Sequence, residues 1–175
     1  MFAGMKLNMV LAVDKKTGGI GYKGKLPWHC PDDMKFFREM TIDHTCICGY
    51  RTFKGMPVLN RRAVIPVSKD GRNASFTIEE LESELGFANA FNNETATGDL
   101  FLIGGAELYL KFLKDGKVDV VYLSEIEFKN TEYEYDTYFQ YPFDEFDKEE
   151  IRSVSTENYD LKIYKLTLKK GDLLC

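Results

Sequence analysis

Asp33 is notable among the ionisable residues of this 175-residue chain because the local pattern places it on an apolar helix face. It lies in a segment from Pro31 to Met40, with Phe36 and Phe37 three and four positions further on. In a helix of 3.6 residues per turn these positions share one face. Burial there disfavours the ionised form and raises the pKa of the carboxyl group, which suits it to acid-base chemistry. The alternative is an Asp at a helix start that lies half in water.

Two stretches ahead of this helix could complete such a site. The only tryptophan, Trp28, follows Leu26 and Pro27 and lies just before the helix. A glycine-rich stretch, Gly18 to Gly24, comes before it. Its glycines suit a lid that closes over reacting groups and excludes water, although they would also suit a long turn.

Two further segments place glycine where a strand should run into a helix. In Ile103-Gly104-Gly105-Ala106, two residues without side chains would let a diphosphate approach the backbone amides at the helix start. Gly49-Tyr50-Arg51-Thr52 offers a second junction of this kind, in which Arg51 is a charge partner for phosphate. A single Gly-Gly turn is usually structural, but the two junctions together favour a phosphate-bearing ligand.

Hydrophobic periods of about two and 3.6 residues alternate along the chain, which indicates strand-helix-strand units. The expected strands are 7–13, 45–48, 63–67, 100–103 and 118–128, followed by a hairpin of 151–156 and 161–168. The expected helices are 31–40, a short one near 50, 77–85 and 106–113, with a loop over 88–98. Pro66 indicates an edge strand because it cannot donate to a ladder, and Thr77 with Glu80 forms a capping box. The pattern predicts an α/β fold with a mostly parallel central sheet, flanking helices and a C-terminal antiparallel hairpin.

Length and composition narrow the possible functions. We expect residues 1–175 to form one domain, with residues 1–4 as an extension if Met5 is the original start. The net charge of −5 argues against nucleic-acid binding, and no apolar run approaches the roughly 20 residues that cross a bilayer. The cysteines lack zinc spacing, so no metal site is expected, and unpaired thiols suit a reducing cytoplasm.

The motifs, taken in order, resemble those of the dihydrofolate reductase family over nearly the whole chain. They are Ala12-x-Asp14, Gly19-Ile20-Gly21, Leu26-Pro27-Trp28, Pro31-x-Asp33 with Phe37, Gly49-Tyr50-Arg51-Thr52-Phe53, Ile103-Gly104-Gly105-Ala106-Glu107-Leu108-Tyr109 and Asp136-Thr137-x-Phe139. The resemblance implies NADPH-dependent reduction of 7,8-dihydrofolate to 5,6,7,8-tetrahydrofolate, which supplies folate one-carbon metabolism and thymidylate synthesis. It also implies a cytoplasmic monomer whose partners are small molecules.

The resemblance assigns catalysis to Asp33 and Trp28. Asp33 would bind the exocyclic amine and a ring nitrogen of the pterin, and Trp28 would help to order the water that protonates N5. The implied substrate-binding residues are Val10, Asp33, Met34, Phe37, Met56, Arg61 and Ser124. Among them, Arg61 would clamp the carboxylate of the glutamyl tail and Ser124 would hydrogen-bond the acid, while Arg62 is interpreted as a surface arginine.

NADPH is the implied cofactor, and the peptide bond between Gly104 and Gly105 is expected to be cis. The implied cofactor-binding residues are Ala12, Ile20, Gly49, Tyr50, Arg51, Thr52, Ser68, Lys69, Gly104, Gly105, Ala106, Glu107, Leu108 and Tyr109. Tyr50 stands where the family usually has Arg, so Arg51, Ser68 and Lys69 become the candidates to hold the 2′-phosphate. If none of them reaches it, the preference for NADPH over NADH should be weak.

Two alternatives remain open at this point. The pyrimidine reductase of riboflavin synthesis shares the fold and NADPH, but the combination of Pro27, Trp28 and Asp33 disfavours it. A folate- or nucleotide-binding protein that has lost catalysis is kept open by Tyr50 and by an apparently shortened loop after Phe53.

Overall fold

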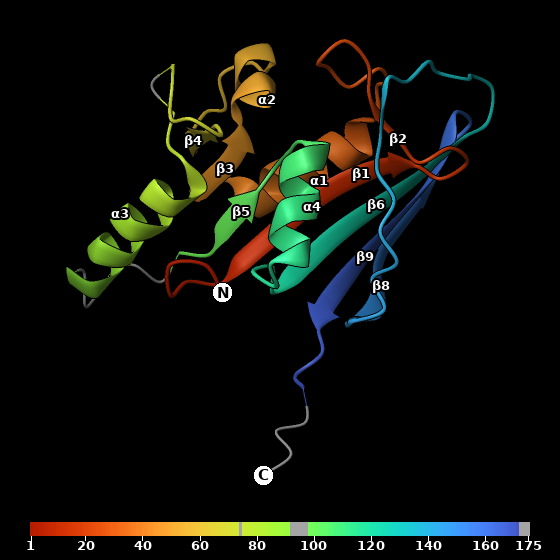
Figure 1. Cartoon of the computed structure of the whole chain (residues 1–175). Helices are drawn as coiled ribbons and strands as arrows, with labels where there is room; N and C mark the ends of the chain where they lie inside the picture. Colours follow the sequence, from red (N-terminus) through yellow and green to blue (C-terminus); the bar gives the residue numbers. More distant parts are fainter. Residues whose placement is uncertain (74, 92–97, 172–175) are drawn as a thin grey trace.

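The computed structural model describes residues 1–73, 75–91 and 98–171, and its centre is a seven-stranded sheet. In spatial order the strands are β4 (Ala63–Val67), β3 (Thr45–Gly49), β5 (Leu100–Leu102), β1 (Leu7–Asp14), β6 (Val120–Phe128), β9 (Tyr159–Leu168) and β8 (Phe146–Ser155). The first five run parallel to one another, and β9 and β8 add antiparallel pairs at one side. The predicted mostly parallel sheet with a C-terminal antiparallel hairpin is therefore confirmed (Figure 1).

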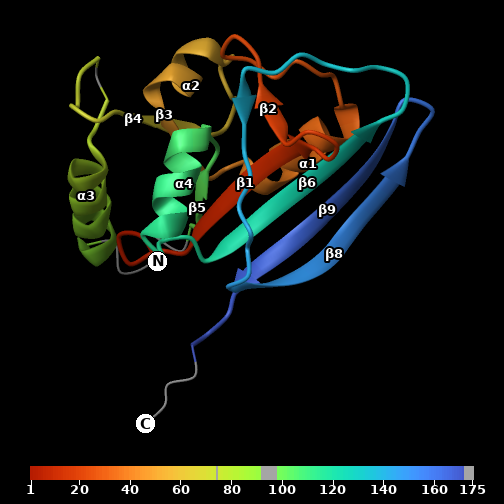
Figure 2. The same cartoon turned by 45° about the vertical axis from the view of Figure 1, so that its right-hand side comes forward.

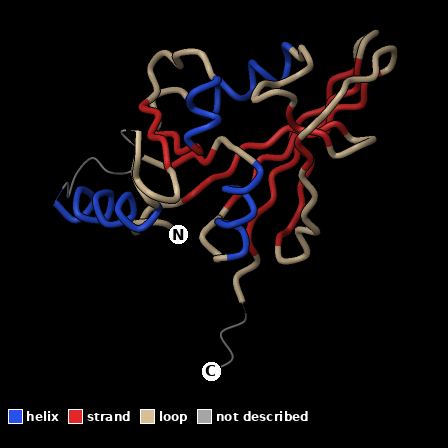
Figure 3. The backbone as a smooth tube through the Cα atoms, turned by 45° about the horizontal axis from the view of Figure 1, so that its top comes forward, coloured by secondary structure: helices blue, strands red, loops and turns tan. Residues whose placement is uncertain are grey.

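Helices cover both faces of this sheet (Figures 1 and 2). They are α1 (Pro31–Thr41), α2 (Tyr50–Gly55), α3 (Ile78–Phe91) and α4 (Ala106–Lys114). In the tube view the strands form one twisted layer with helices on its two sides (Figure 3). Helices α3 and α4 pack on one face, and α1 packs on the other.

The division into two faces follows from the alternation of side chains along β1. Leu7, Met9 and Leu11 belong to the largest apolar cluster, together with Phe112 of α4. Val10, between them, lies in a cluster on the α1 side. Both faces of a parallel strand are buried, which explains why β1 reads as a continuous apolar run.

Several local predictions agree with the structure. Within the seven-stranded sheet β4 is the outermost strand beside β3, so Pro66 does lie in an edge strand, although Val67 also forms an isolated bridge with Phe76. The capping box is formed, because the Thr77 hydroxyl accepts from the amide of Glu80 at 3.2 Å and the Glu80 carboxylate accepts from the amide of Thr77 at 3.0 Å.

Other boundaries differ from expectation. α3 continues to Phe91, so the start of the expected loop over 88–98 is helical, and residues 92–97 lie outside the described part of the chain. The C-terminal hairpin is longer than expected, with β8 beginning at Phe146 and β9 at Tyr159. A separate two-stranded sheet joins β2 (Gly19–Gly21) to β7 (Thr137–Tyr138) and was not expected, since strands of two or three residues carry no readable period.

Candidate active site

Asp33 lies on the buried face of α1, as its spacing predicts. Its side chain is 8% exposed, and Phe36 on the same face is buried. Burial raises the pKa of the Asp33 carboxyl above its usual range, and a hydrogen bond with Ser124 opposes this effect without cancelling it. The helix thus holds an acid that retains its proton more readily than an exposed aspartate does.

The register of the sheet brings Ser124 to this acid. β1 and β6 run parallel with Ala12 opposite Ser124, and Ser124 is almost fully buried. Val10, two residues before Ala12, is in the cluster against which Phe37 of α1 packs. Asp33 therefore adjoins an apolar surface that can receive a flat aromatic ring.

Two other expected substrate-binding residues are less enclosed. Met34 follows Asp33 on the helix and is 52% exposed, and Met56 is half-buried just after α2. Neither belongs to the buried clusters around Val10 and Phe37.

The neighbouring arginines have different surroundings from those expected. Arg61 is exposed, and its guanidinium donates two hydrogen bonds to the carboxylate of Asp43, one of them at 2.9 Å. Arg62 is half-buried, with its guanidinium 6.0 Å from the centre of the Phe37 ring and donating to the Thr41 hydroxyl at 3.3 Å. Of these two arginines, Arg62 is thus the one that lies against α1.

The two glycine junctions meet at the carboxyl ends of β3 and β5. The amide of Gly49 donates to the carbonyl of Gly104 at 2.8 Å. Gly104 has a φ of 142°, which favours glycine, and a Cβ at Gly105 would lie 3.1 Å from the Thr52 hydroxyl. The Gly104–Gly105 bond is cis, as expected. Side chains on these glycines would fill the space between the junctions.

The same junctions begin two helices whose first amides carry no side-chain cap. Gly49 is the N-cap of α2 and Gly105 that of α4, and neither can supply a capping hydrogen bond. Two helix starts without side-chain caps, brought together by glycines, suit an anion such as a diphosphate. The residues present therefore fit the phosphates of a dinucleotide cofactor.

The rim of this cradle carries charged and hydroxyl groups. Lys69, after β4, forms an ion pair with Glu107 of α4 at 3.8 Å, and both side chains are exposed. Ser68 accepts a hydrogen bond from the hydroxyl of Ser75 at 2.6 Å, and Arg51 is exposed at the start of α2. These groups follow the carboxyl ends of β4, β3 and β5, and Tyr50 at the start of α2 is half-buried.

α4 supplies one further group from inside the site. The Tyr109 hydroxyl donates to the carbonyl of Val10 at 2.7 Å, and burial raises the pKa of Tyr109, so the hydroxyl stays protonated. Its role is to tie α4 to β1. Ala106 and Leu108 are partly buried against the largest apolar cluster, which contains Tyr109.

Comparison with known proteins agrees with this geometry. The family model described as dihydrofolate reductase matches residues 6–169. The chain belongs to the dihydrofolate reductase family. It is 31% identical to a dihydrofolate reductase of Staphylococcus aureus over 82% of this chain and 84% of that protein. It is 32% identical to dihydrofolate reductase type 9 of Escherichia coli over 69% of this chain and 70% of that protein.

A solved structure matches the fold as well. Dihydrofolate reductase from Enterococcus faecalis, complexed with NADP(H) and RAB-propyl, has a TM-score of 0.73 and 27% identity, covering 97% of this chain and 99% of that one. The activity of this family is dihydrofolate reduction, an oxidoreductase reaction that uses NADPH.

In this chain the glycine-rich stretch is held at its centre by contacts with β7 and Asp136. β2 pairs antiparallel with β7, and the carboxylate of Asp136 accepts from the amide of Lys23 at 2.8 Å. Trp28 is 7% exposed and lies between the rings of Phe128 and Tyr135, at 5.6 and 5.9 Å. Ile20, within β2, is half-buried. The stretch therefore has the contacts of an ordered loop beside Trp28.

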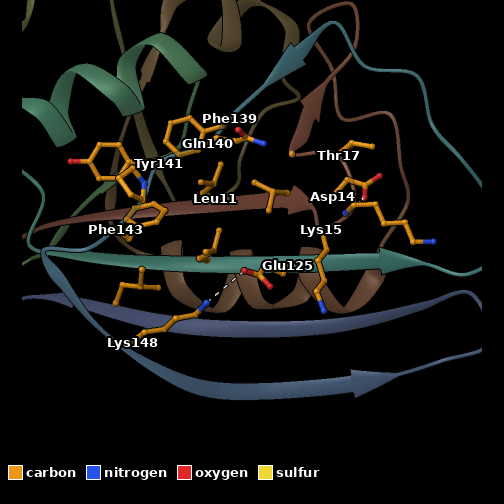
Figure 4. A pocket seen from close by; sticks show the side chains of 16 residues that line it. Leu11, Asp14, Lys15, Thr17, Glu125, Phe139, Gln140, Tyr141, Phe143 and Lys148 are labelled. Atoms are coloured by element: carbon orange, nitrogen blue, oxygen red, sulfur yellow. Dashed lines mark hydrogen bonds and ion pairs between the residues drawn. The ribbon is translucent and has the colours of Figure 1, made fainter.

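A pocket of about 360 Å³ lies on the other face of the sheet and does not include Asp33 (Figure 4). Leu11 and Leu123, which alternate with Ala12 and Ser124, form part of its floor. Two of the charged groups at this pocket form an ion pair, in which Lys148 lies 3.7 Å from Glu125. It is a separate feature from the candidate active site.

Two other searches bear on function. Within the described residues no helix has the length and apolar character to span a bilayer. In that same part of the chain no three His, Cys, Asp or Glu side chains gather in a way that could hold a metal ion.

Proposed function

We propose that Asp33 is the acid with which this reductase binds the pterin of dihydrofolate. The observation that carries the proposal is a carboxyl group, 8% exposed, whose pKa burial raises and which has the Ser124 hydroxyl beside it. A group of this kind can bind an amine and a ring nitrogen side by side in an apolar slot. Val10 and Phe37 supply the apolar surface next to it.

NADPH, when bound, supplies the hydride. The residues of the chain orient the reacting groups and control the proton. Asp33, steadied by Ser124, fixes the pterin ring, and Trp28 helps to order a water from which N5 is protonated. The loop around β2 excludes other water from the site.

We further propose that the glycine junctions hold the phosphates of NADPH. Gly49, Gly104 and Gly105 allow close approach to the free amides of α2 and α4, which the N-cap geometry supports. Ala12, Ile20 and Thr52 complete this side of the site, with Ala106, Glu107, Leu108 and Tyr109 on α4.

The 2′-phosphate requires cations, because Tyr50 cannot neutralise it. Arg51 and Lys69 are exposed cations at the rim of the cradle, and Ser68, next to Lys69 in the chain, offers a hydroxyl. Lys69 already has Glu107 as a partner at 3.8 Å, so a phosphate would compete with that carboxylate. We therefore expect a modest preference for NADPH over NADH.

For the glutamyl tail we propose Arg62 in place of Arg61. Arg62 lies against Phe37 of the Asp33 helix, whereas both ends of the Arg61 fork are held by Asp43. Replacing Arg62 by Ala should raise the KM for dihydrofolate by about 10- to 100-fold, the loss of a charge-assisted pair, with kcat little changed. The matched Arg61→Ala should stay within about threefold of the original KM. Equal KM values for the two variants would contradict the assignment.

We also propose that residues 1–175 act as one domain, in a monomer, in the cytoplasm. One sheet joins seven of the nine described strands, including β1 near the start of the chain and β9 near its end. The exposed edge strand β8 carries Lys148, Glu149 and Glu150, and such charges oppose pairing between edges. The buried cysteines of β3 are free thiols, which suits a reducing compartment.

Activity of the purified protein tests the whole proposal. Loss of nicotinamide absorbance should require NADPH and dihydrofolate together. The pyrimidine substrate of riboflavin synthesis, supplied instead, should give no turnover. Turnover with the pyrimidine alone would favour the related reductase, and binding of NADPH and folate without turnover would favour a protein that has lost catalysis.

A further inference from the structure

A partly buried hydrogen bond joins two segments that flank the loop around β2. The Tyr135 hydroxyl donates to one carboxylate oxygen of Asp14 at 2.6 Å, across 121 positions of sequence. The other oxygen of Asp14 accepts from the amide of Lys16 at 3.0 Å. Asp14 ends β1 and is 6% exposed, and Tyr135 is half-buried, so this bond is partly shielded from competing water.

The ring of Tyr135 lies between the loop and the tryptophan. A Cβ built on Gly19 would come within 2.2 Å of this ring, so β2 rests directly on it. The ring also contacts Trp28, with 5.9 Å between the ring centroids and the two planes inclined at 67°. A shift of the Tyr135 ring would therefore displace both β2 and Trp28.

The residue that follows Tyr135 strengthens the connection. The amide of Asp136 donates to the carbonyl of Gly21 at 3.0 Å, and its carboxylate accepts from Lys23. The backbone of this segment thus holds the far part of the loop, while the Tyr135 side chain supports its beginning. Burial and the adjacent Asp14 carboxylate raise the pKa of Tyr135, so its hydroxyl remains a donor at neutral pH.

We propose that Tyr135 is a positioning residue for hydride transfer, fixed by Asp14 and acting through Trp28 and β2. The proposal rests on the role of Trp28 given above. A positioning residue of this kind changes the fraction of time in which the reacting groups are aligned, more than it changes affinity. Its removal should therefore lower the rate of the chemical step with little effect on ligand binding.

Tyr135→Phe tests this, since it deletes only the hydroxyl. We expect single-turnover hydride transfer, followed by stopped flow with NADPH and with NADPH deuterated at C4, to slow about tenfold. The KM for dihydrofolate and the Kd for NADPH should stay within about twofold. Acrylamide quenching of Trp28, the only tryptophan, should increase. Tyr141→Phe, the same change outside this contact, should match the unaltered protein in each measurement.

Asp14→Asn and the double variant test the coupling. Asn keeps the shape of Asp14 but offers one oxygen to the two donors, the Tyr135 hydroxyl and the Lys16 amide. The rate of hydride transfer should therefore fall by less than in Tyr135→Phe. The double variant should be no slower than Tyr135→Phe alone, because both changes remove one bond. Multiplying effects would show that the residues act independently and would overturn the proposal.

Other results would overturn it as well. One is a Tyr135→Phe variant in which neither the rate of hydride transfer nor the quenching of Trp28 changes. The other is a Tyr135→Phe variant with a lower melting temperature and a normal rate of hydride transfer. Failure of the unaltered protein to reduce dihydrofolate would refute the proposed function instead, and quenching would still report whether Tyr135 holds Trp28.

Discussion

Asp33→Asn separates the chemical role of the acid from its structural role. Asn has nearly the same shape, and its amide oxygen can still accept from the Ser124 hydroxyl. The change therefore removes the charge and the exchangeable proton while the surrounding contacts stay in place. Because general acid-base catalysis contributes about 10²- to 10⁴-fold, we expect turnover at pH 7 to fall by that factor, or by about 3–5 kcal/mol of barrier.

The same substitution should make the protein more stable at neutral pH. Burial raises the pKa of Asp33 in the folded protein above its ordinary value of 3.8. The free energy of unfolding therefore has its full Asp33 contribution below pH 3.8, where the group is protonated in both states, and loses it as the pH rises through the folded-state pKa. Asn carries no charge at any of these pH values. The melting temperature of the variant should thus exceed that of the unaltered protein at pH 7, and the difference should vanish in acid. In a chain of this size 1 kcal/mol corresponds to about 2–4 °C.

Three measurements examine this reasoning together. Turnover is followed by loss of nicotinamide absorbance, NADPH binding by quenching of Trp28 fluorescence, and unfolding by calorimetry from acid to neutral pH. Asp32→Asn is the matched control, because Asp32 is on the same helix turn but accepts from the Tyr159 hydroxyl. It should retain turnover within about threefold. Normal turnover in Asp33→Asn, or a lower melting temperature at pH 7, would refute the argument.

Other predictions concern glycines. Gly105→Ala places a Cβ 3.1 Å from the Thr52 hydroxyl, in the space proposed for phosphate, so isothermal titration should show NADPH affinity reduced by about tenfold or more and folate affinity nearly unchanged. Equal losses of affinity for NADPH and for folate would contradict the proposed phosphate-binding role of the glycine junctions. Gly19→Ala would crowd the Tyr135 ring and should lower stability by about 1–3 kcal/mol in a denaturant titration. Gly86→Ala, in α3 with open space around it, should instead raise stability by about 0.5–1 kcal/mol, and a loss there would show that the helix assignment is wrong.

Local patterns in the sequence were sufficient to predict much of the fold and the burial of Asp33. The spacing of Phe36 and Phe37 after Asp33 defines one helix face, and the structure buries Asp33 on it. The capping pair of Thr77 and Glu80 and the edge position of Pro66 are equally local. Such features depend on contacts within one turn or one strand, so the residues that make them are close together in the chain.

Tertiary structure alone decided which distant polar groups meet. Arg61 and Arg62 are neighbours of the same type, and only the path of the backbone into β4 turns one toward Asp43 and the other toward Phe37. The bond between Asp14 and Tyr135 spans most of the chain and leaves no pattern in it. The hydrophobic period of a sequence indicates which face of an element is buried. The residues that it meets on that face depend on sheet order and register, which form only when the whole chain packs.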